Sequence, residues 1–517
     1  MTKLRIPWGR KSSTDPSTSD PDAEVKKQNR QSFSGFRNLI NWDTETPTEQ
    51  NHPATSAANG TSDKVQEVSQ LISLAKKIGA EAEKLEAYLK ENGLPDPSFG
   101  VDAPGDFPKL SEEAQRSRLE IAHATKELGD LVRGPRENVR WGVWSFLDTL
   151  SLQIVNNYGI GKYSASSKTS IPLTLAAAKL VPLDKPIALS ELQTKTTLDP
   201  VNLARILRHS MTNHVFCEPT PGFIAHTASS RLLAQDGPLQ DWVGFNSEDI
   251  FPAAASVLSA IKTHPEATSL TRTGFNVAFD TVDKEPMFAT FGKDPVRAKR
   301  MGGAMASLTG GEGYEVQHFV DSYDLSEIDE KAGVLVDIGG SHGFVCTDLA
   351  KKWKKMKFVV QDLPKTVDSA PKPISDDESI AERVELQAHD FFQEQSVKGA
   401  DVYFFRWIIH NYSTPYAIKL LKNLVPALKP GARVVINDHC LQEPGTENPW
   451  DEKLMRSMDM VMLCLLNAQE RTEDEFRELF RAADERFVFK RASRSPGCRM
   501  SVIEAVWNPE PVEVEEV

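Results

Sequence analysis

Apolar positions in the C-terminal part of the chain form short continuous runs that alternate with stretches at helical spacing. The runs predict buried strands, and the stretches between them predict helices. The predicted strands are residues 334–338, 358–362, 401–405 and 433–437, with a last hairpin near 487–490 and 499–505. The predicted helices include residues 344–357, 416–428 and 472–483. Strands that alternate with helices in this way are typical of an α/β domain.

Helical spacing dominates the N-terminal part. Apolar residues recur at this spacing from Val65 to Leu89, and a second helix is predicted from Glu112 to Val132, after a break rich in Pro and Gly. We expect these two helices to pack as a hairpin, which could also contact a partner subunit. Residues 1–63 are rich in Ser, Thr, Pro, Asn, Asp and Gln, a composition that predicts a disordered extension.

Two helices and a β-hairpin are predicted between residues 141 and 233. Ser190-Glu-Leu-Gln193 is interpreted as a capping box that opens a short helix, and Asp199-Pro200 as the start of a helix that ends at Met211. Two short strands are expected around Pro219-Thr-Pro-Gly222. This order of elements is that of a winged helix, which either binds DNA or serves as a structural or dimerisation module. We favour the second role, because the candidate recognition helix carries only Arg205, Arg208 and His209 as basic residues.

Composition narrows the possible partners. The chain has 517 residues, a formal net charge of -13 and a pI of about 5.5, so nucleic acid and anionic membranes would repel it. Its five cysteines lack the paired spacing of metal ligands, which is typical of reduced intracellular thiols. No apolar run is long enough to span a bilayer, and the basic N-terminus lacks the apolar core of a secretory signal. We therefore expect a cytosolic protein with no membrane or nucleic-acid partner.

A glycine-rich turn, Val336-Asp-Ile-Gly-Gly-Ser-His-Gly343, joins the first predicted strand to the helix that follows, and the next strand ends at Asp362. This is how an α/β sheet holds a nucleoside-containing cofactor. Glycines let the backbone approach the ligand, and the second acid accepts hydrogen bonds from the ribose hydroxyls. The turn alone does not identify the cofactor, since a nicotinamide dinucleotide would also suit it.

Polar and aromatic residues recur at the predicted carboxyl ends of the strands, where open α/β sheets bind their ligands. They are Asp337, Gly339, Asp362, Asp390, Phe391, Arg406, His410, Asp438 and Glu470. Several have a plainer explanation, because Asp337 could be a structural acid, Arg406 could pair with an acid, and Glu470 could lie at the surface. A lone histidine is usually an interior residue, but the position of His410 directly after a strand favours a functional role.

His410 with acids nearby suits general-base chemistry. Its ordinary pKa near 6.5 lets it accept a proton at neutral pH, and an acid bonded to the other ring nitrogen fixes the tautomer. Thr472-Glu-Asp-Glu475 is interpreted as a capping box that fixes the helix start just after Glu470, which suits an orienting carboxylate. The Met-rich stretch 455–462 is either core or an adaptable wall for an aromatic ligand.

In this order, the motifs resemble those of S-adenosylmethionine-dependent O-methyltransferases of the plant caffeic-acid type, and especially their fungal relatives acting on aromatic polyketides. The resemblance covers roughly Val65 to Val506. Besides the glycine turn, its most specific segments are Gln361-Asp-Leu-Pro364, His389-Asp-Phe-Phe392, Phe405-Arg-Trp-Ile-Ile-His-Asn-Tyr-Ser413, Leu428-Lys-Pro-Gly-Ala-Arg433 and Glu470-Arg-Thr472. Several motifs in this order are far more specific than any one of them.

The resemblance implies an α/β fold in which a Rossmann-like methyltransferase domain follows an N-terminal helical and winged-helix dimerisation domain. The implied organisation is an extension at 1–63, the dimerisation domain at 64–235, a helical linker and substrate-pocket region at 236–330, the methyltransferase domain at 331–508 and an acidic tail at 509–517. The resemblance also implies S-adenosyl-L-methionine as the cofactor, no metal, and a homodimer.

Roles for single residues follow from the same resemblance. Asp337 and Gly339 would line the methionine end of the cofactor, Asp362 would bind the ribose diol, Asp390 and Phe391 the adenine, and Arg406 would replace a cofactor-contacting lysine. His410 would be the general base, bracketed by Asp438 and Glu470. The chain departs from the family pattern at Ser341-His342, where more glycine is usual, and at Asn411, where an acid is common. Asp438 is shorter than the usual glutamate, so whether it reaches His410 is a question for the structure.

The resulting hypothesis is methyl transfer from S-adenosylmethionine to a hydroxyl of an aromatic substrate, a phenol or polyketide, with His410 removing the phenolic proton. The alternatives are an NAD(P)-dependent oxidoreductase that uses the same turn, a metal-dependent methyltransferase with Asp438 as a ligand, and a winged-helix regulator that has lost catalysis. The sequence of the pocket-forming segments does not identify the acceptor.

Overall fold

The computed structural model of the chain describes residues 69–158 and 180–509. The extension predicted at 1–63 lies outside these residues, as does nearly all of the tail predicted at 509–517. Among the described residues, no helix is long and apolar enough to cross a membrane.

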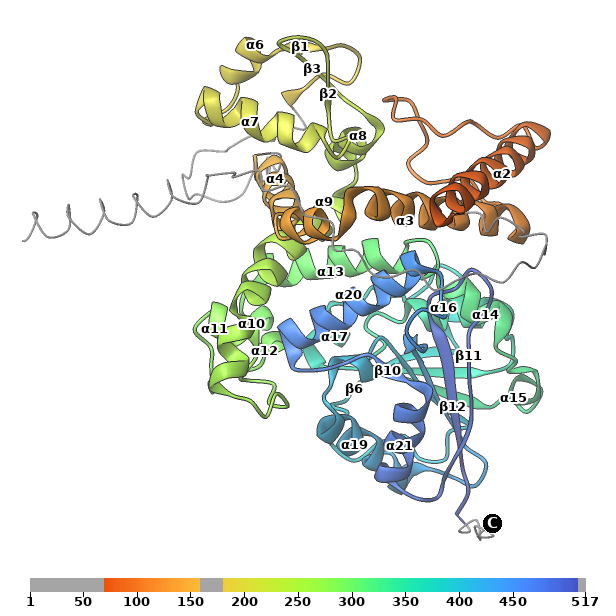
Figure 1. Ribbon diagram of the computed structural model, residues 1–517. Helices are drawn as coiled ribbons and strands as arrows, with labels where there is room; N and C mark the ends of the chain where they lie inside the picture. The colour runs from red at the N-terminus through yellow and green to blue at the C-terminus, as the bar shows by residue number, and fades with distance from the viewer. Residues whose placement is uncertain (1–68, 159–179, 510–517) are drawn as a thin grey trace, which may run out of the picture. The chain divides into compact units, whose positions relative to one another are not determined.

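Two long helices, α2 (Gln70–Glu91) and α3 (Glu112–Gly142), form the predicted N-terminal hairpin (Figure 1). Their apolar sides meet in a small core of Leu85, Leu89 and Ala114. The second helix breaks close to Val132, where its end was predicted. The helix resumes after a kink at Gly134, whose φ is +74°, and the kink is followed by Pro135, which lacks a backbone donor.

The next elements have the order predicted for a winged helix. They are the helices α4 (Phe146–Asn157), α6 (Leu189–Gln193) and α7 (Pro200–Met211), and the strands β1 (Ile187–Ala188), β2 (Cys217–Thr220) and β3 (Phe223–Ala225). The strands pair as β1-β3-β2, with antiparallel neighbours. Asp199 caps α7 as predicted, by accepting hydrogen bonds from the backbone of Val201 and Asn202. The capping box predicted at Ser190 is wrong, because α6 already begins at Leu189 and its N-cap, Ala188, has no side chain that can accept a hydrogen bond.

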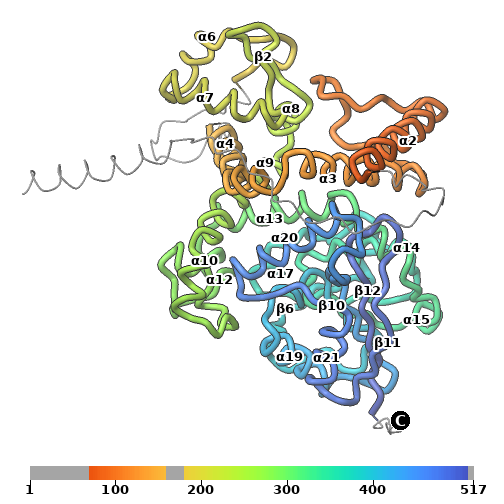
Figure 2. The backbone as a smooth tube through the Cα atoms, viewed as in Figure 1, coloured from red at the N-terminus to blue at the C-terminus, as the bar shows by residue number. Residues whose placement is uncertain are grey.

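Helices fill the segment between the winged-helix elements and the main sheet (Figure 2). They are α8 (Ala228–Gln235), α9 (Gly237–Phe245), a π-helical turn η1 (Asn246–Ile250), α10 (Phe251–Thr263), α11 (Gly274–Ala278), α12 (Met287–Lys293), α13 (Pro295–Thr309), α14 (Val316–Ser322) and α15 (Ser326–Glu330). Asp294 caps α13 by accepting hydrogen bonds from the backbone N–H groups of Val296 and Arg297. The fully buried Asp249 of η1 binds Arg297 and Arg300 of α13, so a charged cluster fastens these two elements.

Seven strands form the main sheet, in the order β11-β12-β8-β7-β4-β5-β6. They are β4 (Val334–Ile338), β5 (Lys357–Asp362), β6 (Val384–Ala388), β7 (Val402–Arg406), β8 (Arg433–Asp438), β11 (Phe487–Ser493) and β12 (Ser501–Trp507). Strands β4 to β8 are parallel, whereas β12 is antiparallel to β8 and β11 is antiparallel to β12. The chain order reverses between β4 and β7, which is the point where doubly wound sheets bind ligands.

Helices cover both faces of this sheet, which confirms the predicted Rossmann-like α/β class. They are α16 (Phe344–Lys352), α17 (Pro364–Ser369), α18 (Glu378–Ala381), α19 (Thr414–Lys422), α20 (Pro449–Leu466) and α21 (Glu473–Ala483), with 3-10 turns η2 (Ile409–Asn411) and η3 (Val425–Ala427). One apolar core lies between the sheet and α19 with α21, and another lies between the sheet and α14 with α16. Both cores are centred on the parallel strands, so they hold the carboxyl ends of those strands rigidly.

Some predicted boundaries in this domain are wrong. The helix predicted at 344–357 ends at Lys352, because Trp353 has extended backbone and β5 follows at Lys357. The helix predicted at 416–428 runs from Thr414 to Lys422. Three strands were not predicted: β6, β9 (Cys440–Leu441) and β10 (Arg471–Thr472). Strand β6 lies at the sheet edge and carries Glu385 and Gln387, so it lacks the continuous apolar run that marks the central strands.

Candidate active site

His410 and Glu470 form a buried pair at the carboxyl edge of the sheet. His410 lies in η2, directly after β7, and its Nδ1 is 2.8 Å from Glu470 Oε1. The side chains of His410 and Glu470 are 6% and 0% exposed. The guanidinium of Arg471 donates hydrogen bonds to the carbonyls of Ile409 and Tyr412, so it holds η2 from both sides of His410. The structure thus brings together two residues that are 60 positions apart in the sequence.

The position of Glu470 depends on a short parallel pairing of β9 with β10, in which Cys440 is opposite Arg471. Glu470 immediately precedes β10, and its backbone N–H donates to Asp459 Oδ1 at 2.9 Å. The helix that follows, α21, begins with the predicted capping box, since Thr472 and Glu475 exchange hydrogen bonds. Strand pairing, backbone bond and helix cap together leave Glu470 little freedom.

Charge and burial act against each other in this pair. Burial alone would lower the pKa of His410, but the Glu470 carboxylate outweighs it and raises that pKa above its ordinary value. Burial likewise opposes ionisation of Glu470, yet the adjacent His410 lowers the Glu470 pKa to about 2. Glu470 is therefore the carboxylate that stabilises a proton on His410.

Asp438 lies next to His410 but does not bond its ring. Its Oδ2 accepts a hydrogen bond from the backbone N–H of His410 at 3.1 Å. The side chain is fully buried, and burial raises its pKa. The short acid therefore fixes the backbone of η2, while Glu470 alone orients the imidazole.

Three aromatic residues without a role predicted from the sequence also lie at this site: His439, Trp407 and Tyr314. His439 follows Asp438 and is fully buried, with its Nδ1 3.4 Å from Glu470 Oε1. Trp407 has a φ of +58°, and its ring lies 5.0 Å from the His410 ring and 5.1 Å from the His439 ring. The Tyr314 ring contacts both Trp407 and His439, at 5.5 and 5.6 Å. His439 was detectable as a histidine at the end of a predicted strand, but Tyr314 comes from a loop and gave no signal.

The glycine turn lies at the carboxyl end of β4, as predicted. Gly339 has a φ of +77°, and a Cβ there would lie 2.5 Å from Ile408 Cδ1, so only glycine fits. Asp337, which precedes it, is 1% exposed and accepts a bond from the Cys346 thiol at 3.5 Å. Among the described residues, no basic side chain forms an ion pair with Asp337, and burial raises its pKa to about 7.

Asp362 lies at the end of β5, beside the turn. Its Oδ2 accepts a hydrogen bond from the Ser341 backbone at 3.0 Å, and its Oδ1 accepts one from Leu363 at 2.8 Å. Ser341 has a φ of +52°, so the departure from glycine at this position is a non-glycine residue held in a left-handed conformation by Asp362. Each carboxylate oxygen keeps a second lone pair, which leaves acceptor capacity for a diol.

The other residues predicted to contact the cofactor differ in whether they lie beside the glycine turn. Phe391 lies close to Gly339, since a Cβ on that glycine would be 3.7 Å from the Phe391 ring. Asp390 is exposed, and its Oδ1 accepts a bond from the Phe392 backbone. Arg406 binds Asn437 and the Tyr314 carbonyl, so its guanidinium braces two strands and a loop. One continuous surface is therefore formed by the glycine turn, Asp362 and Phe391. The Arg406 guanidinium, in contrast, is occupied by hydrogen bonds to Asn437 and Tyr314.

The Met-rich stretch on α20 belongs partly to the core. Met455 and Met462 are buried, as core residues are, whereas Met460 is 55% exposed. Across the described ranges, no group of three or more His, Cys, Asp or Glu side chains is placed to hold a metal ion.

The residues fit a cationic nucleoside cofactor. Asp362 has free acceptor capacity for ribose hydroxyls, Phe391 offers an aromatic surface, and Asp337 is a buried acid without a basic partner that a positive charge would ionise. Fold and site together define an α/β enzyme that binds such a cofactor beside a buried histidine–carboxylate pair.

Comparison with known proteins identifies the family. A family profile described as an O-methyltransferase domain matches residues 267–484. The chain is 64% identical over 440 residues to a chlorophenol O-methyltransferase of Trichoderma longibrachiatum, a match that covers 85% of this chain and 91% of that protein. It is 36% identical to O-methyltransferase AMT9 of Alternaria alternata, over 86% of this chain and 99% of the relative. The crystal structure of OxaC in complex with SAH and oxaline superposes with a TM-score of 0.65 over 85% of this chain and all of that one, at 23% identity.

The chain belongs to the O-methyltransferase family, as its motifs predicted. It is therefore an S-adenosylmethionine-dependent transferase whose relatives include enzymes of fungal secondary metabolism. The family match does not favour two of the alternatives left open by the sequence. These were an oxidoreductase that uses the same glycine turn and a winged-helix regulator that has lost catalysis.

Proposed function

We propose that this enzyme methylates a hydroxyl group of an aromatic acceptor and that His410 is the general base. The contact of 2.8 Å between His410 Nδ1 and Glu470 carries the proposal. With Nδ1–H donated to Glu470, the lone pair of Nε2 is the one that can accept a phenolic proton. Glu470 then stabilises the imidazolium, and Asp438 keeps the backbone of η2 in place.

S-adenosylmethionine, when bound, supplies an activated methyl group on a positively charged sulfur. We propose that Asp337 and Gly339 hold its methionine end, Asp362 its ribose, and Asp390 with Phe391 its adenine. Arg406 contributes by bracing the strands around them. Because the sulfur loses its charge in the reaction, positioning of the acceptor oxygen and removal of its proton account for most of what the protein must do.

The base assignment is tested with His410→Ala. We expect its kcat/KM to fall about 100-fold or more, because proton transfer by a positioned side chain contributes about that much. Calorimetry must show that the variant still binds S-adenosylmethionine, and His318→Ala, on helix α14, where His318 pairs with Glu315, controls for the loss of a histidine. Full turnover by His410→Ala with cofactor bound would reject the assignment.

For the acceptor, we propose a small phenol, and a chlorinated phenol first. The support is the 64% identical relative, which is named a chlorophenol O-methyltransferase. Incubation with methyl-labelled S-adenosylmethionine and a panel of chlorophenols, unsubstituted phenols and aromatic polyketides, followed by mass spectrometry, tests this. Methylation of polyketides without methylation of chlorophenols would contradict the choice of acceptor but not the reaction.

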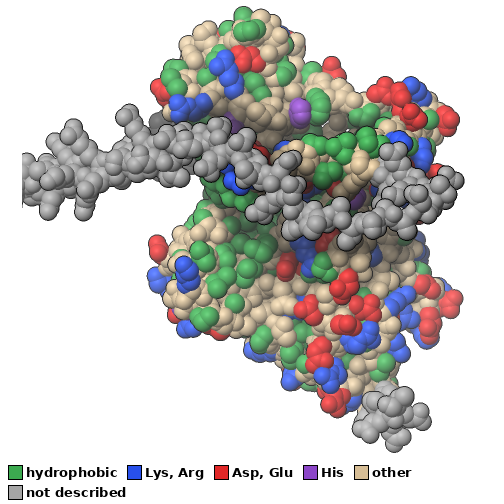
Figure 3. Space-filling model, viewed as in Figure 1, with side chains coloured by type: hydrophobic (Ala, Val, Ile, Leu, Met, Phe, Trp, Pro, Cys, Tyr) green, Lys and Arg blue, Asp and Glu red, His purple; other side chains and the backbone are tan. Residues whose placement is uncertain are grey.

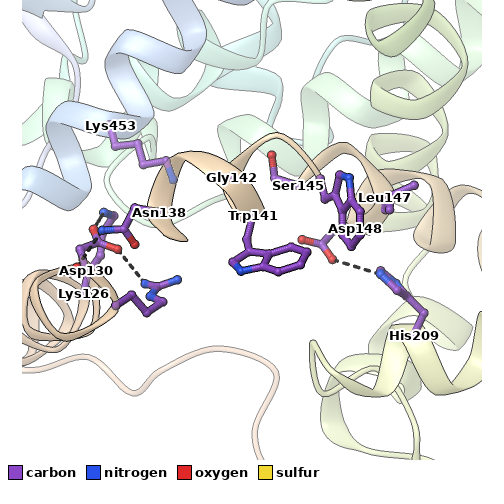
Figure 4. A pocket seen from close by; sticks show the side chains of 12 residues that line it. Lys126, Asp130, Asn138, Trp141, Gly142, Ser145, Leu147, Asp148, His209 and Lys453 are labelled. Atoms are coloured by element: carbon purple, nitrogen blue, oxygen red, sulfur yellow. Dashed lines mark hydrogen bonds and ion pairs between the residues drawn. The ribbon is translucent and has the colours of Figure 1, made fainter. Parts of the chain in front are cut away.

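We also propose a homodimer, in the cytosol, formed through the region of α3 and α4. Eight large apolar side chains between the end of α3 and the middle of α4 are exposed: Leu131, Val132, Val139, Trp141, Val143, Trp144, Phe146 and Leu150. Figure 4 shows Trp141 projecting into a cavity of about 600 Å³ between Asp130 and Asp148. A patch of this size on a monomer would favour association.

On the face shown in Figure 3, acidic and basic side chains are interspersed over the sheet domain, so the surface there offers no continuous basic path for nucleic acid.

Sedimentation velocity tests the dimer. Trp141→Glu and Trp144→Glu together should give a monomer, whereas Val201→Glu, at an equally exposed apolar position on α7, should leave the sedimentation coefficient unchanged. A wild-type protein that sediments as a monomer would contradict the proposal.

A further inference from the structure

His439 is a buried titratable residue that the mechanism above does not use. It lies directly after Asp438 at the carboxyl end of β8, and the parallel pairing of Cys440 with Arg471 places it beside Glu470. Its side chain is fully buried. The two histidines therefore reach one carboxylate from different strands.

The imidazole rings of His410 and His439 both lie close to the same oxygen atom of Glu470. Oε1 lies 2.8 Å from Nδ1 of His410 and 3.4 Å from Nδ1 of His439, so the contact with His439 is the longer and weaker one. Among the described residues, Glu470 Oε2 and both ring nitrogens of His439 are buried without a hydrogen-bond partner, so the 3.4 Å approach of His439 Nδ1 to Glu470 Oε1 is an electrostatic contact and not a hydrogen bond. A buried polar group that lacks a partner destabilises a protein, whereas an apolar side chain would fill the same space at no such cost.

Other charged groups surround the cluster on each side. Asp438 accepts the backbone N–H of His410, and Asp459 of α20 accepts that of Glu470. Arg471 is buried against the carbonyls that flank His410, and Arg406 of β7 binds Asn437. The aromatic rings of Trp407 and Tyr314 also contact the His439 ring. His439 is thus the only side chain besides His410 whose ion-pair contact with Glu470 falls within 4.0 Å in the described part of the chain.

Sharing of Glu470 between the two histidines changes how easily His410 is protonated. A carboxylate that interacts with His410 alone favours the imidazolium, which cannot accept a proton from the acceptor. A proton on His439 Nδ1, 3.4 Å from the same oxygen, offsets part of its negative charge through space. Less of the charge then acts on His410, and a larger fraction of His410 is neutral near pH 7.

We propose that His439 is a positioning residue that shares Glu470 with His410 and thereby keeps His410 in the neutral form that can accept a proton. The proposal rests on His410 being the general base, as proposed above. It adds a second histidine, acting only through Glu470, to the acid–base machinery.

The pH profile of kcat/KM, from about pH 5.5 to about 9.5, tests the proposal. His439→Leu removes the N–H, and its acid limb should move to higher pH by about half a unit, which lowers activity about threefold at pH 6 but little at pH 9. His439→Gln keeps an N–H donor and should restore the wild-type limb. His318→Leu controls for histidine loss and should leave the profile unchanged.

A second measurement does not depend on turnover. NMR titration of ring-labelled histidines in the protein without cofactor should show a higher His410 pKa in His439→Leu than in wild type. If His439→Leu does not fold, His439→Met replaces it as the variant without a donor, because methionine adapts to irregular spaces.

The outcomes separate the two proposals. Equal loss at every pH, or identical profiles for the Leu and Gln variants, would mean that His439 only fills space, and the inference would fail while His410→Ala still abolishes turnover. Undiminished turnover by His410→Ala would reject the base itself and this inference with it.

Discussion

Glu470 Oε1 lies 2.8 Å from Nδ1 of His410, in a site that solvent hardly reaches. The carboxylate orients the imidazole and raises its pKa, so it also sets the pH range in which the imidazole is neutral. Burial makes this contact stronger than a similar one at the surface would be.

Glu470→Gln should lower kcat/KM about 100-fold, because the amide neither stabilises the imidazolium nor fixes one tautomer. Loss of the negative charge lowers the His410 pKa, so the acid limb of the pH profile should move to lower pH. This direction is opposite to that expected for His439→Leu. A limb that moves to higher pH, measured from initial rates at saturating cofactor, would contradict the assignment.

Asp337→Asn should have opposite effects on stability and on cofactor binding. Burial raises the Asp337 pKa to about 7, above its unfolded value near 3.9, so the acid contributes stability at low pH that is lost as the pH rises through about 7. The amide of the variant does not ionise, so the variant keeps its stability as the pH rises. Without cofactor at pH 8, it should therefore unfold at a higher temperature than wild type.

The same substitution should weaken S-adenosylmethionine binding at pH 8, where wild-type Asp337 is ionised and attracts the cationic ligand. Calorimetry at pH 6 and pH 8 should show wild-type binding that tightens with pH, and Asp337→Asn binding that does not. If the affinity for S-adenosylmethionine depends on pH equally in the two proteins, the group whose ionisation affects binding is not Asp337.

Gly339→Ala should destabilise the protein by more than the cost of a left-handed alanine, which is about 1–2 kcal/mol. The added Cβ would lie 2.5 Å from Ile408 Cδ1. Gly399→Ala is the matched control, since Gly399 has a similar φ of +70° and no atom within 4 Å of its Cβ position. Urea unfolding measures the difference, and adding Ile408→Val, which removes Cδ1, should recover part of it.

Thr472→Ala should cost about 1 kcal/mol of unfolding free energy, because the Thr472 side chain caps α21. Activity should also fall, since Glu470 lies two residues before this cap. Ser190→Ala is the control: Ser190 shows the same sequence pattern but caps no helix, so its substitution should change stability little. Equal losses in the two variants would mean that the cap at Thr472 does not stabilise the site.

The sequence was most informative where one segment determines its own structure. Runs such as Val334–Ile338 predicted the central strands correctly, because continuous apolar runs are buried wherever they lie, and the glycine turn lies at the carboxyl end of β4 as predicted. The capping box at Thr472 was also correct, whereas the one at Ser190 failed because the adjacent strand β1 leads directly into the helix at Leu189.

Contacts between distant segments could not be predicted from the sequence. Nothing local shows that Glu470 rather than Asp438 meets the His410 ring, since that choice follows from the pairing of two-residue strands. His439 was visible at a strand end, but its contact with Glu470 depends on the same pairing. Arg406 was expected at the cofactor, and only the fold shows that Asn437 and Tyr314 occupy its guanidinium.

The pairing of β9 with β10 fastens the two ends of the segment that contains α20. Residues 442–470 leave the sheet edge after β9 and return to it at β10, so changes along α20 are confined between two fixed points. Asp459 on that helix accepts the Glu470 backbone N–H, so substitutions at the exposed positions of α20 leave that bond in place. A helix held between two paired strands is thus a segment whose exposed face can change in sequence while the sheet edge beside Glu470 keeps its shape.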